Sequence, residues 1–341
     1  MNLPPDGVLV RHDLMKVAHG DLSEVPPGVL GLFYTGAVNA LQGEPGGGKS
    51  WLALAAVADV VGHGGGAVVL DFEDTSSTAA SRLLALGLGV EDLDRVAYFN
   101  LAGPLRKPDL LWLRELVTEA AVDLVVVDSV PEALAAEGLD ENHSGQVSSW
   151  AQKLPRPLAR AGACVLLVDH VTKATDGRGR WARGSGAKLA FIDGAAYSLD
   201  VGLPFSRNAS GTAVLTVAKD RRGLVGAAGN IAASVRFVVE AGSLCRVVVG
   251  QGQAGEILNR LDKGFVLTML ERSGGSWASR KEASIVLGVS PEVVGSLLRP
   301  FIGSFLVEEC HGQRVSYRLV EDAASNVLNL ACERARREDR P

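Results

Sequence analysis

Residues 43–50 read GEPGGGKS, and they separate a short apolar run at 37–42 from a long Ala- and Leu-rich stretch at 50–62. Gly at the first and sixth positions, followed by Lys-Ser, is the pattern of a phosphate-binding loop, which needs a strand before it and a helix after it. The two flanking segments supply that context; the alternative is a chance Gly-rich turn before a helix. We therefore predict an α/β fold in which this loop joins a strand to a buried helix.

Each part of the loop suits phosphate chemistry. Gly46, Gly47 and Gly48 allow backbone N–H groups to turn toward phosphate oxygens, and the helix that follows adds the positive end of its dipole. Lys49 would place a positive charge on the β- and γ-phosphates, and the Ser50 hydroxyl would ligate Mg²⁺. The predicted nucleotide-binding residues are Gly43, Glu44, Pro45, Gly46, Gly47, Gly48, Lys49, Ser50 and Trp51.

Strand-like and helix-like segments alternate after this loop. Strands are predicted at 66–74, 96–101, 123–129 and 163–170, and helices at 77–87, 108–121 and 144–162, the last interrupted by Pro155 and Pro157. This alternation indicates a mostly parallel sheet with helices on both faces. Three further strands, at 195–201, 212–220 and 235–242, have no helices between them, which indicates an antiparallel extension of the sheet.

Two carboxylates end predicted strands near the loop. Asp128 ends the apolar strand at 123–129, where open α/β sheets hold their ligands, so we expect it to hold the metal; the alternative is that it caps the next helix. Glu73 ends the strand at 66–74 and would polarise the attacking water, unless it belongs to a solvated acidic loop. Asp71 points to the same face as Glu73 but lies deeper, so we prefer Glu73.

The composition excludes several classes of protein. The chain has 341 residues, 47% of them hydrophobic, and a net charge of −5, which is typical of a folded protein and argues against a surface that binds nucleic acid all over. The four cysteines lack metal-ligand or disulfide spacing, no apolar stretch is long enough to span a membrane, and the N-terminus lacks the apolar segment of a signal peptide. We expect a cytoplasmic protein with no membrane partner.

The last third of the chain predicts a second, smaller unit. Residues 261–275 have helical spacing, and 279–301 read as helix, turn, helix, with Gly288 in the turn and Pro291 opening the second helix. Two strands follow at 305–320, and this order resembles a winged helix-turn-helix. Its second helix offers few phosphate-binding side chains, so duplex DNA and a protein partner remain equal alternatives.

Four blocks carry a wider resemblance: GEPGGGKSWLAL, DFEDTSSTAASRLLALG, VVVDSV and LLVDHVTK with the RGSGAKLAFID that follows it. In order and spacing, over about residues 30–225, they resemble the RecA-like P-loop ATPases. Within this group, the blocks resemble those of RepA-type hexameric helicases of plasmids and phages and of AAA family ATPases of actinobacterial mobile elements. The resemblance implies a Mg²⁺-dependent ATPase with a RecA-like sheet.

The resemblance also assigns roles to individual residues. Lys49 and Ser50 would bind phosphate and Mg²⁺, Glu73 would activate water, and Asp128 would hold the metal through water. His170, at the end of the strand at 163–170, would sense the γ-phosphate. A structural histidine, hydrogen-bonded at a strand end, is the alternative for His170.

Residues 217–223, VAKDRRG, are similar to the K-x-R segment that DnaB-type helicases insert into a neighbour's nucleotide site. Lys219 and Arg221 would then act in trans on the γ-phosphate, with Arg222 as a competing candidate. The alternative is a charged hairpin tip. The trans reading implies a homo-oligomeric ring, a hexamer in the family.

Residues 172–190 form the most basic loop of the chain, and in the RecA-like family the loop after this strand contacts single-stranded DNA. Basic side chains would pair with phosphates, and an aromatic ring would stack on a base; the alternative is a solvated loop that binds nothing. The predicted contacts are Lys173, Arg178, Arg180, Trp181, Arg183 and Lys188.

Two functions follow from these predictions. The first is ATP hydrolysis coupled to binding or translocation of single-stranded DNA, as in a replicative helicase of a mobile element. The second is an ATP-switched DNA-binding regulator, or a helicase loader or recombination-type protein, that acts through the winged helix. The predicted units are an arm at 1–34, an ATPase domain at 35–250, a linker at 251–258, a winged helix at 259–322 and a charged tail at 323–341.

Overall fold

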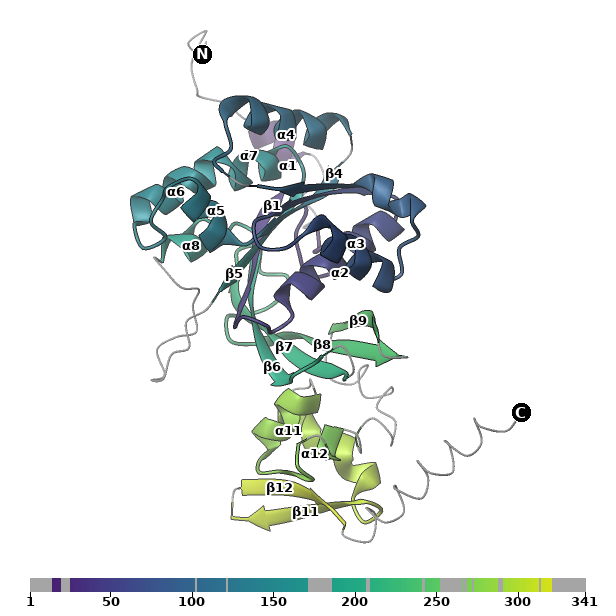
Figure 1. Ribbon diagram of the computed structural model, residues 1–341. Helices are drawn as coiled ribbons and strands as arrows, with labels where there is room; N and C mark the ends of the chain where they lie inside the picture. Colours follow the sequence, from purple (N-terminus) through teal and green to yellow (C-terminus); the bar gives the residue numbers. More distant parts are fainter. Residues whose placement is uncertain are drawn as a thin grey trace, which may run out of the picture.

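The computed structural model describes residues 14–19, 25–101, 103–120, 122–170, 186–206, 209–240, 243–251, 266, 269–271, 273–287, 291–312 and 314–320. Two sheets organise this part of the chain. A nine-stranded sheet has the order β3-β2-β4-β5-β1-β6-β7-β8-β9, and a separate three-stranded sheet has the order β10-β12-β11 (Figure 1). None of the described helices has both the length and the apolar character needed to cross a membrane.

The large sheet is mostly parallel, as predicted. Its strands are β1 (Ala37–Gly43), β2 (Gly66–Asp71), β3 (Val96–Asn100), β4 (Val122–Asp128), β5 (Cys164–His170), β6 (Ala195–Leu203), β7 (Gly211–Asp220), β8 (Ile231–Glu240) and β9 (Ser243–Gln251). Strands β1 to β6 run parallel, and β7, β8 and β9 add antiparallel pairs. The register pairs Gly43 with His170 and Asp71 with Asp128, so these strand ends meet at one edge of the sheet.

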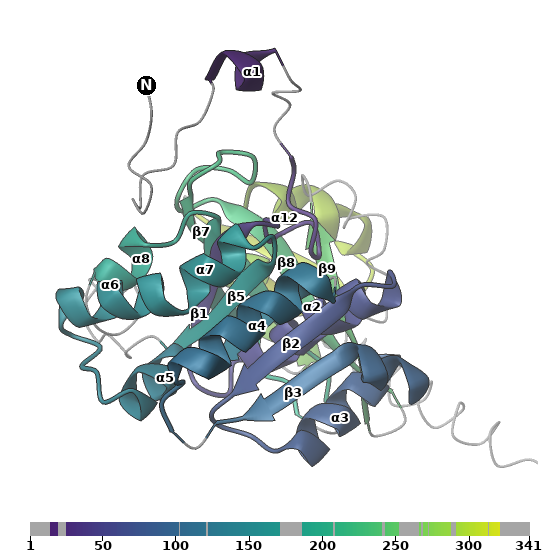
Figure 2. The same cartoon turned by 90° about the horizontal axis from the view of Figure 1, so that it is seen from above.

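Helices cover both faces of the sheet (Figures 1 and 2). One face carries α2 (Lys49–Gly62), α3 (Ser76–Ala85) and the 3-10 turn η1 (Glu91–Arg95), and the other carries α4 (Lys107–Glu119), α5 (Val130–Ala136), α6 (Ser144–Lys153), α7 (Pro155–Arg160) and α8 (Ala187–Ala190). Each face has its own buried cluster, with Leu52 and Leu83 in the first, and Leu113, Trp150 and Leu158 in the second. A short helix, α1 (Leu14–Ala18), precedes the sheet.

Local chemistry explains where several helices begin. The Thr75 side chain accepts the backbone N–H of Thr78 and caps α3. Pro155 occupies the start of α7, where its missing N–H costs nothing, so the predicted helical region at 144–162 divides into α6 and α7 at this residue.

Two elements, strand β9 of the large sheet and helix α5 beside it, are not predicted from the sequence. Strand β9 pairs with β8 only and forms the edge of the sheet, and its end lies in the Gly-rich segment that we predict as a linker. Helix α5 has only seven residues, which is too short for helical periodicity to be recognised.

The smaller unit contains α11 (Arg280–Leu287), α12 (Pro291–Leu298), the 3-10 turn η2 (Arg299–Phe301) and the strands β10 (Ser276–Trp277), β11 (Leu306–His311) and β12 (Arg314–Leu319). Trp277, Tyr317 and Phe305 fill its core, which also includes Leu203 of β6. Helix α11 packs on β6 and β7, where the Thr212 hydroxyl donates to the Val286 carbonyl oxygen at 2.6 Å. The unit therefore rests on the antiparallel extension of the large sheet (Figure 1).

Candidate functional site

The predicted phosphate-binding loop joins β1 to α2. Gly46 and Gly48 have φ values of 74° and 98°, in the left-handed region that favours glycine, and Gly48 is the N-cap of α2. The Lys49 ammonium lies back over the loop and donates to the carbonyl oxygens of Gly43 and Glu44, each at 2.9 Å. Burial lowers the pKa of Lys49 from its ordinary value, although Asp128 and Glu73 oppose this shift. The lysine is thus held inside the loop that a phosphate would enter.

The rings of Phe205 and Phe237 lie against this loop, and the sequence pattern did not predict that they belong to the site. Phe205 and Phe237 stack with ring centroids 4.2 Å apart. A Cβ at Gly48 would lie 2.4 Å from Cζ of Phe237, so this glycine is also required for packing. The antiparallel extension therefore contacts the phosphate-binding loop directly.

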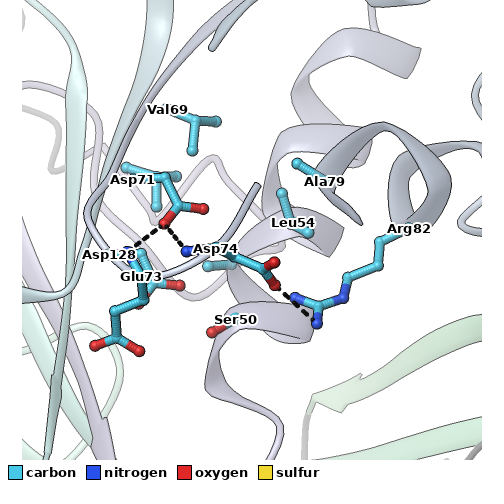
Figure 3. Close-up of a pocket in the computed structure, with 11 residues that line it drawn as sticks. Ser50, Leu54, Val69, Asp71, Glu73, Asp74, Ala79, Arg82 and Asp128 are labelled. Atoms are coloured by element: carbon cyan, nitrogen blue, oxygen red, sulfur yellow. Dashed lines mark hydrogen bonds and ion pairs between the residues drawn. The ribbon is translucent and has the colours of Figure 1, made fainter. Parts of the chain in front are cut away.

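Beside the loop, a pocket of about 230 Å³ opens between α2, α3 and the ends of β2 and β4 (Figure 3). Its polar lining consists of Ser50, Asp71, Glu73, Asp74, Arg82 and Asp128. Arg82 pairs with Asp74 at 3.0 Å and stands over the ring of Trp51, with 5.3 Å from its guanidinium carbon to the ring centroid. Arg82 belongs to the block DFEDTSSTAASRLLALG, but it was not predicted from the sequence as a site residue.

Asp128 is buried at the end of β4, and the Ser50 side chain is hydrogen-bonded to it. Burial raises the pKa of Asp128 to about 6, against the lowering effect of the Ser50 hydrogen bond. Its Oδ1 is buried without a hydrogen-bond partner. The N-cap of α5 is Ser129, so Asp128 is not the capping residue that we considered as an alternative.

A metal ion fits these residues. An orphaned carboxylate oxygen next to a serine hydroxyl suits Mg²⁺, which uses one or two protein ligands and completes its shell with phosphate and water oxygens. Within the described ranges, no group of three or more His, Cys, Asp or Glu side chains is arranged to hold a metal by itself. The site therefore suits a metal that arrives with a nucleotide.

Glu73, Ser129 and His170 meet at the ends of three neighbouring strands. The Ser129 hydroxyl donates to Glu73 Oε1, and His170 Nε2 lies 3.0 Å from the same oxygen. The hydrogen bond from His170 is the main cause that lowers the pKa of Glu73, and it exceeds the opposing effect of partial burial. The structure thus brings together Glu73 and His170, which the sequence predicted separately, and adds Ser129, whose only signal was its place after Asp128.

Asp71 has a different part in the same region. Its Oδ1 accepts the backbone N–H groups of Glu73 and Asp74, both at 2.8 Å, and its Oδ2 accepts the Tyr98 hydroxyl at 2.8 Å. Asp71 therefore organises the turn that carries Glu73, which explains why Glu73, and not Asp71, reaches His170.

Lys188 does not have the surroundings of a DNA contact. Only 5% of it is exposed, and its ammonium pairs with Glu141 Oε2 at 2.8 Å and with Asp169 Oδ1 at 3.1 Å. Burial raises the pKa of Asp169, and the charge of Lys188 opposes that shift. The expectation that Lys188 binds DNA is therefore wrong on this geometry. The other predicted DNA contacts, Lys173, Arg178, Arg180, Trp181 and Arg183, lie outside the described residues.

The predicted trans-acting residues lie near the amino-terminal ends of the parallel strands, whereas the phosphate-binding loop follows the carboxyl end of β1. Asp220, at the end of β7, pairs with Ala195 at the start of β6, and β6 runs parallel to β1. Residues 219–222 are therefore about one strand length away from the chain's own phosphate-binding loop.

The three basic side chains of this segment have different environments. Lys219 donates to the carbonyl oxygens of Leu189, Ala190 and Ile192 at 2.7–3.2 Å, and burial lowers its pKa. Arg222 stands over the ring of Tyr34, 4.9 Å from its centroid. Arg221 is exposed and forms no ion pair within the described chain. Of the competing arginines, Arg221 is the one with an available guanidinium.

Comparisons with known proteins agree with this site. Residues 14–176 match a family model described as an AAA domain. Protein RecA 1 of Myxococcus xanthus is 30% identical over 151 residues, which cover 42% of this chain and 42% of that protein. Protein RecA of Picosynechococcus is 29% identical over 181 residues, covering 48% and 49%, and the mouse DNA repair protein RAD51 homolog 4 is 28% identical over 185 residues, covering 49% and 56%.

The large sheet and its helices have the RecA-like α/β arrangement that the sequence predicts. The predicted fold is thereby confirmed, and the similarity to an AAA domain and to RecA proteins supports nucleotide binding. The chain spans about half the length of the curated relatives that it matches. The resemblance to RepA-type helicases stays a prediction.

Proposed function

We propose that this chain is a Mg²⁺-dependent ATPase that assembles into a ring and couples ATP hydrolysis to binding or translocation of single-stranded DNA. The observation that carries the proposal is the contact between Glu73 and His170 beside Lys49, Ser50 and Asp128. These groups supply a phosphate cradle, a metal-binding pair and an oriented carboxylate at one edge of the sheet, as hydrolysis of a γ-phosphate requires.

The residues divide the work as follows. Lys49 leaves the carbonyl oxygens of its loop and turns to the β- and γ-phosphates. Ser50 and Asp128 would hold Mg²⁺, which neutralises charge on the phosphates. Glu73, kept ionised by its hydrogen bonds, orients a water for attack on the γ-phosphate. His170 touches Glu73 and lies at the start of the basic loop, so it links the state of the nucleotide to that loop.

The ring and the DNA belong to the same proposal. Arg221 lies at the sheet edge opposite its own nucleotide, so it acts on the nucleotide of a neighbouring copy, and we propose a hexamer. Lys219 would support Arg221 by holding α8. Lys173, Arg178, Arg180, Trp181 and Arg183 would contact DNA in the lumen, and the relative named as a DNA repair protein supports a DNA partner.

The first test is ATP hydrolysis by the wild type and by Lys49→Ala, with and without single-stranded DNA, together with the particle mass in solution. We expect turnover that rises with DNA, comes from an assembled particle and falls by at least about 100-fold in the variant, because the lysine's charge is lost from the phosphates. Unwinding of a forked duplex then tests the helicase proposal.

A suitable control is Lys107→Ala, which removes a lysine of similar charge from the exposed start of α4 and should leave turnover unchanged. Slow turnover from a monomer, indifferent to DNA, would contradict the proposal.

A second candidate function rests on the smaller unit. Helices α11 and α12 and the three-stranded antiparallel sheet support the winged-helix prediction for residues 259–322. Helix α11 also packs on strands that contact the phosphate-binding loop. In this alternative, ATP switches the assembly of a regulator or loader whose winged helix binds duplex DNA or a protein. A nucleotide-dependent change of particle mass without stimulation by single-stranded DNA would favour it.

A further inference from the structure

A pocket of about 290 Å³ lies at the sheet edge that carries Arg221, far from the chain's own nucleotide site. Helix α7 contributes Arg156 and Arg160, which are one turn apart and so share a face of the helix. Arg221 follows β7, and Asp193 comes from the segment between α8 and β6. Three guanidinium groups from two separate segments therefore line one cavity.

The charges in this pocket are not balanced within the described part of the chain. No ion pair there involves Arg156, Arg160 or Arg221, and Asp193 already accepts the backbone N–H of Val38 at 2.7 Å. Burial is the main cause of the lowered pKa of the nearby Lys219; the charges of Arg221 and Arg156 lower it further, and the charge of Asp193 opposes them. Positive groups gathered in this way repel one another unless an anion joins them.

The position of the pocket excludes the chain's own nucleotide. Strand β1 has seven residues between this edge and the phosphate-binding loop, and at the usual rise per residue that is a separation of about 20 Å. A pocket lined by several guanidinium forks suits phosphate groups, which accept paired hydrogen bonds from each fork.

We propose that Arg156 and Arg160 complete, with Arg221, a pocket that binds the phosphates of a nucleotide held by a second copy of this chain. The inference rests on the proposed ring and extends it, because it adds two phosphate-binding residues on α7 that no motif contains. Each nucleotide would then be held between the phosphate-binding loop of one copy and the arginine pocket of the next.

The test is a mixing experiment with the full chain. Arg156→Ala/Arg160→Ala should bind ATP like the wild type but turn it over about 10- to 100-fold more slowly, as expected for the loss of charged hydrogen bonds. Lys49→Ala is inactive in its own loop and keeps the arginine pocket. When the two variants are mixed in equal amounts and reassembled, roughly a quarter of the interfaces should pair an intact loop with an intact pocket and recover turnover.

Two further variants make the result decisive. Arg114→Ala removes an exposed arginine of α4 that does not line the pocket, and it should keep wild-type turnover. Arg156→Lys/Arg160→Lys keeps the charge without the fork, so it should fall between the wild type and the alanine variant.

The outcomes distinguish the arginine pocket from the proposed ring-forming ATPase on which it rests. A wild type that neither assembles nor hydrolyses ATP overturns both. An active, assembled wild type together with a fully active alanine variant overturns the arginine pocket alone, and so does a mixture that recovers no turnover. Recovery in the mixture also shows that the alanine variant is folded.

Discussion

At the scale of single residues, the site is held by side chains that meet from distant parts of the chain. Glu73 and His170 are separated by 97 residues in sequence, yet they are hydrogen-bonded because β2 and β5 end at the same edge of the sheet. Each could be predicted from its place after an apolar strand. Their contact could not, because it depends on the order of strands in the sheet.

His170→Ala should shift the pH dependence of hydrolysis. Its hydrogen bond is the main cause of the lowered pKa of Glu73, so removing it raises that pKa toward the ordinary value. In the proposed mechanism Glu73 must be ionised to orient water, so the acid limb of the kcat profile should move to higher pH, with a lower plateau. The measurement is kcat against pH at saturating ATP.

Ser129→Ala is the matched comparison, because it removes the smaller of the two hydrogen bonds to Glu73 and should shift the acid limb less. An unchanged acid limb in His170→Ala would show that this histidine has only a structural role.

The DNA-binding prediction for Lys188 failed for a related reason, because the contacts of this side chain depend on the fold. In sequence, Lys188 stands among basic and glycine residues and resembles the rest of the loop. In the fold, the start of α8 returns to the sheet, where the buried carboxylate of Asp169 needs a positive partner. Composition indicates the charge of a segment, but not which of its charges turns inward.

At the scale of elements, the turn after β7 is built around one carboxylate. Asp220 accepts the backbone N–H groups of Arg222 at 3.0 Å and Val225 at 2.7 Å, and the Tyr34 hydroxyl at 3.1 Å. Burial acts to raise the pKa of Asp220, but hydrogen bonds from Val225, Gly223 and Tyr34 outweigh it, and the net shift is downward. Burial also raises the pKa of Tyr34, to about 12. The turn that presents Arg221 is therefore stabilised by an ionised aspartate.

Asp220→Asn should destabilise the fold at neutral pH by about 1 kcal/mol, a modest figure because the group is partly exposed to solvent. A lowered folded-state pKa gives stability that is present above the unfolded pKa and is lost as the pH falls through the folded value. The difference in Tm from the wild type should thus be full at pH 7 and shrink below about pH 4.

Thermal unfolding across this pH range is the measurement. Asp200→Asn on β6, an exposed carboxylate bound only by Thr216 at 3.2 Å among the contacts described, is the control and should change Tm little at any pH. A Tm difference that stays constant down to pH 3 would contradict the assignment.

At the scale of the whole molecule, the docking of the smaller unit was not predictable from the sequence. The residues that allow it are small and isolated. A Cβ at Gly202 of β6 would lie 2.2 Å from the backbone carbonyl oxygen of Ile285 in α11, so only glycine permits this approach. Apolar periodicity predicts the helices and strands of both units. It does not predict where a glycine lets two elements approach closely, because a single glycine has no periodic pattern.

Gly202→Val should therefore release the smaller unit from the sheet. We expect a larger radius of gyration in small-angle X-ray scattering and a separate, earlier unfolding transition for the released unit. Gly62→Ala, at the open end of α2 where an added Cβ meets nothing within 4 Å, is the control and should leave both measurements unchanged. A variant with the wild-type radius would show that docking does not depend on this approach.

The phosphate-binding loop and Arg221 lie at opposite ends of the parallel strands, so the subunit has two different functional ends. In the proposed ring, each copy contacts its two neighbours through two different surfaces, so the contact is head-to-tail and not two-fold. An open row of copies leaves one unfinished nucleotide site at its end, however long it grows, whereas closure leaves none. Dilution alone would then silence the enzyme, and the cell could control turnover through the abundance of the chain.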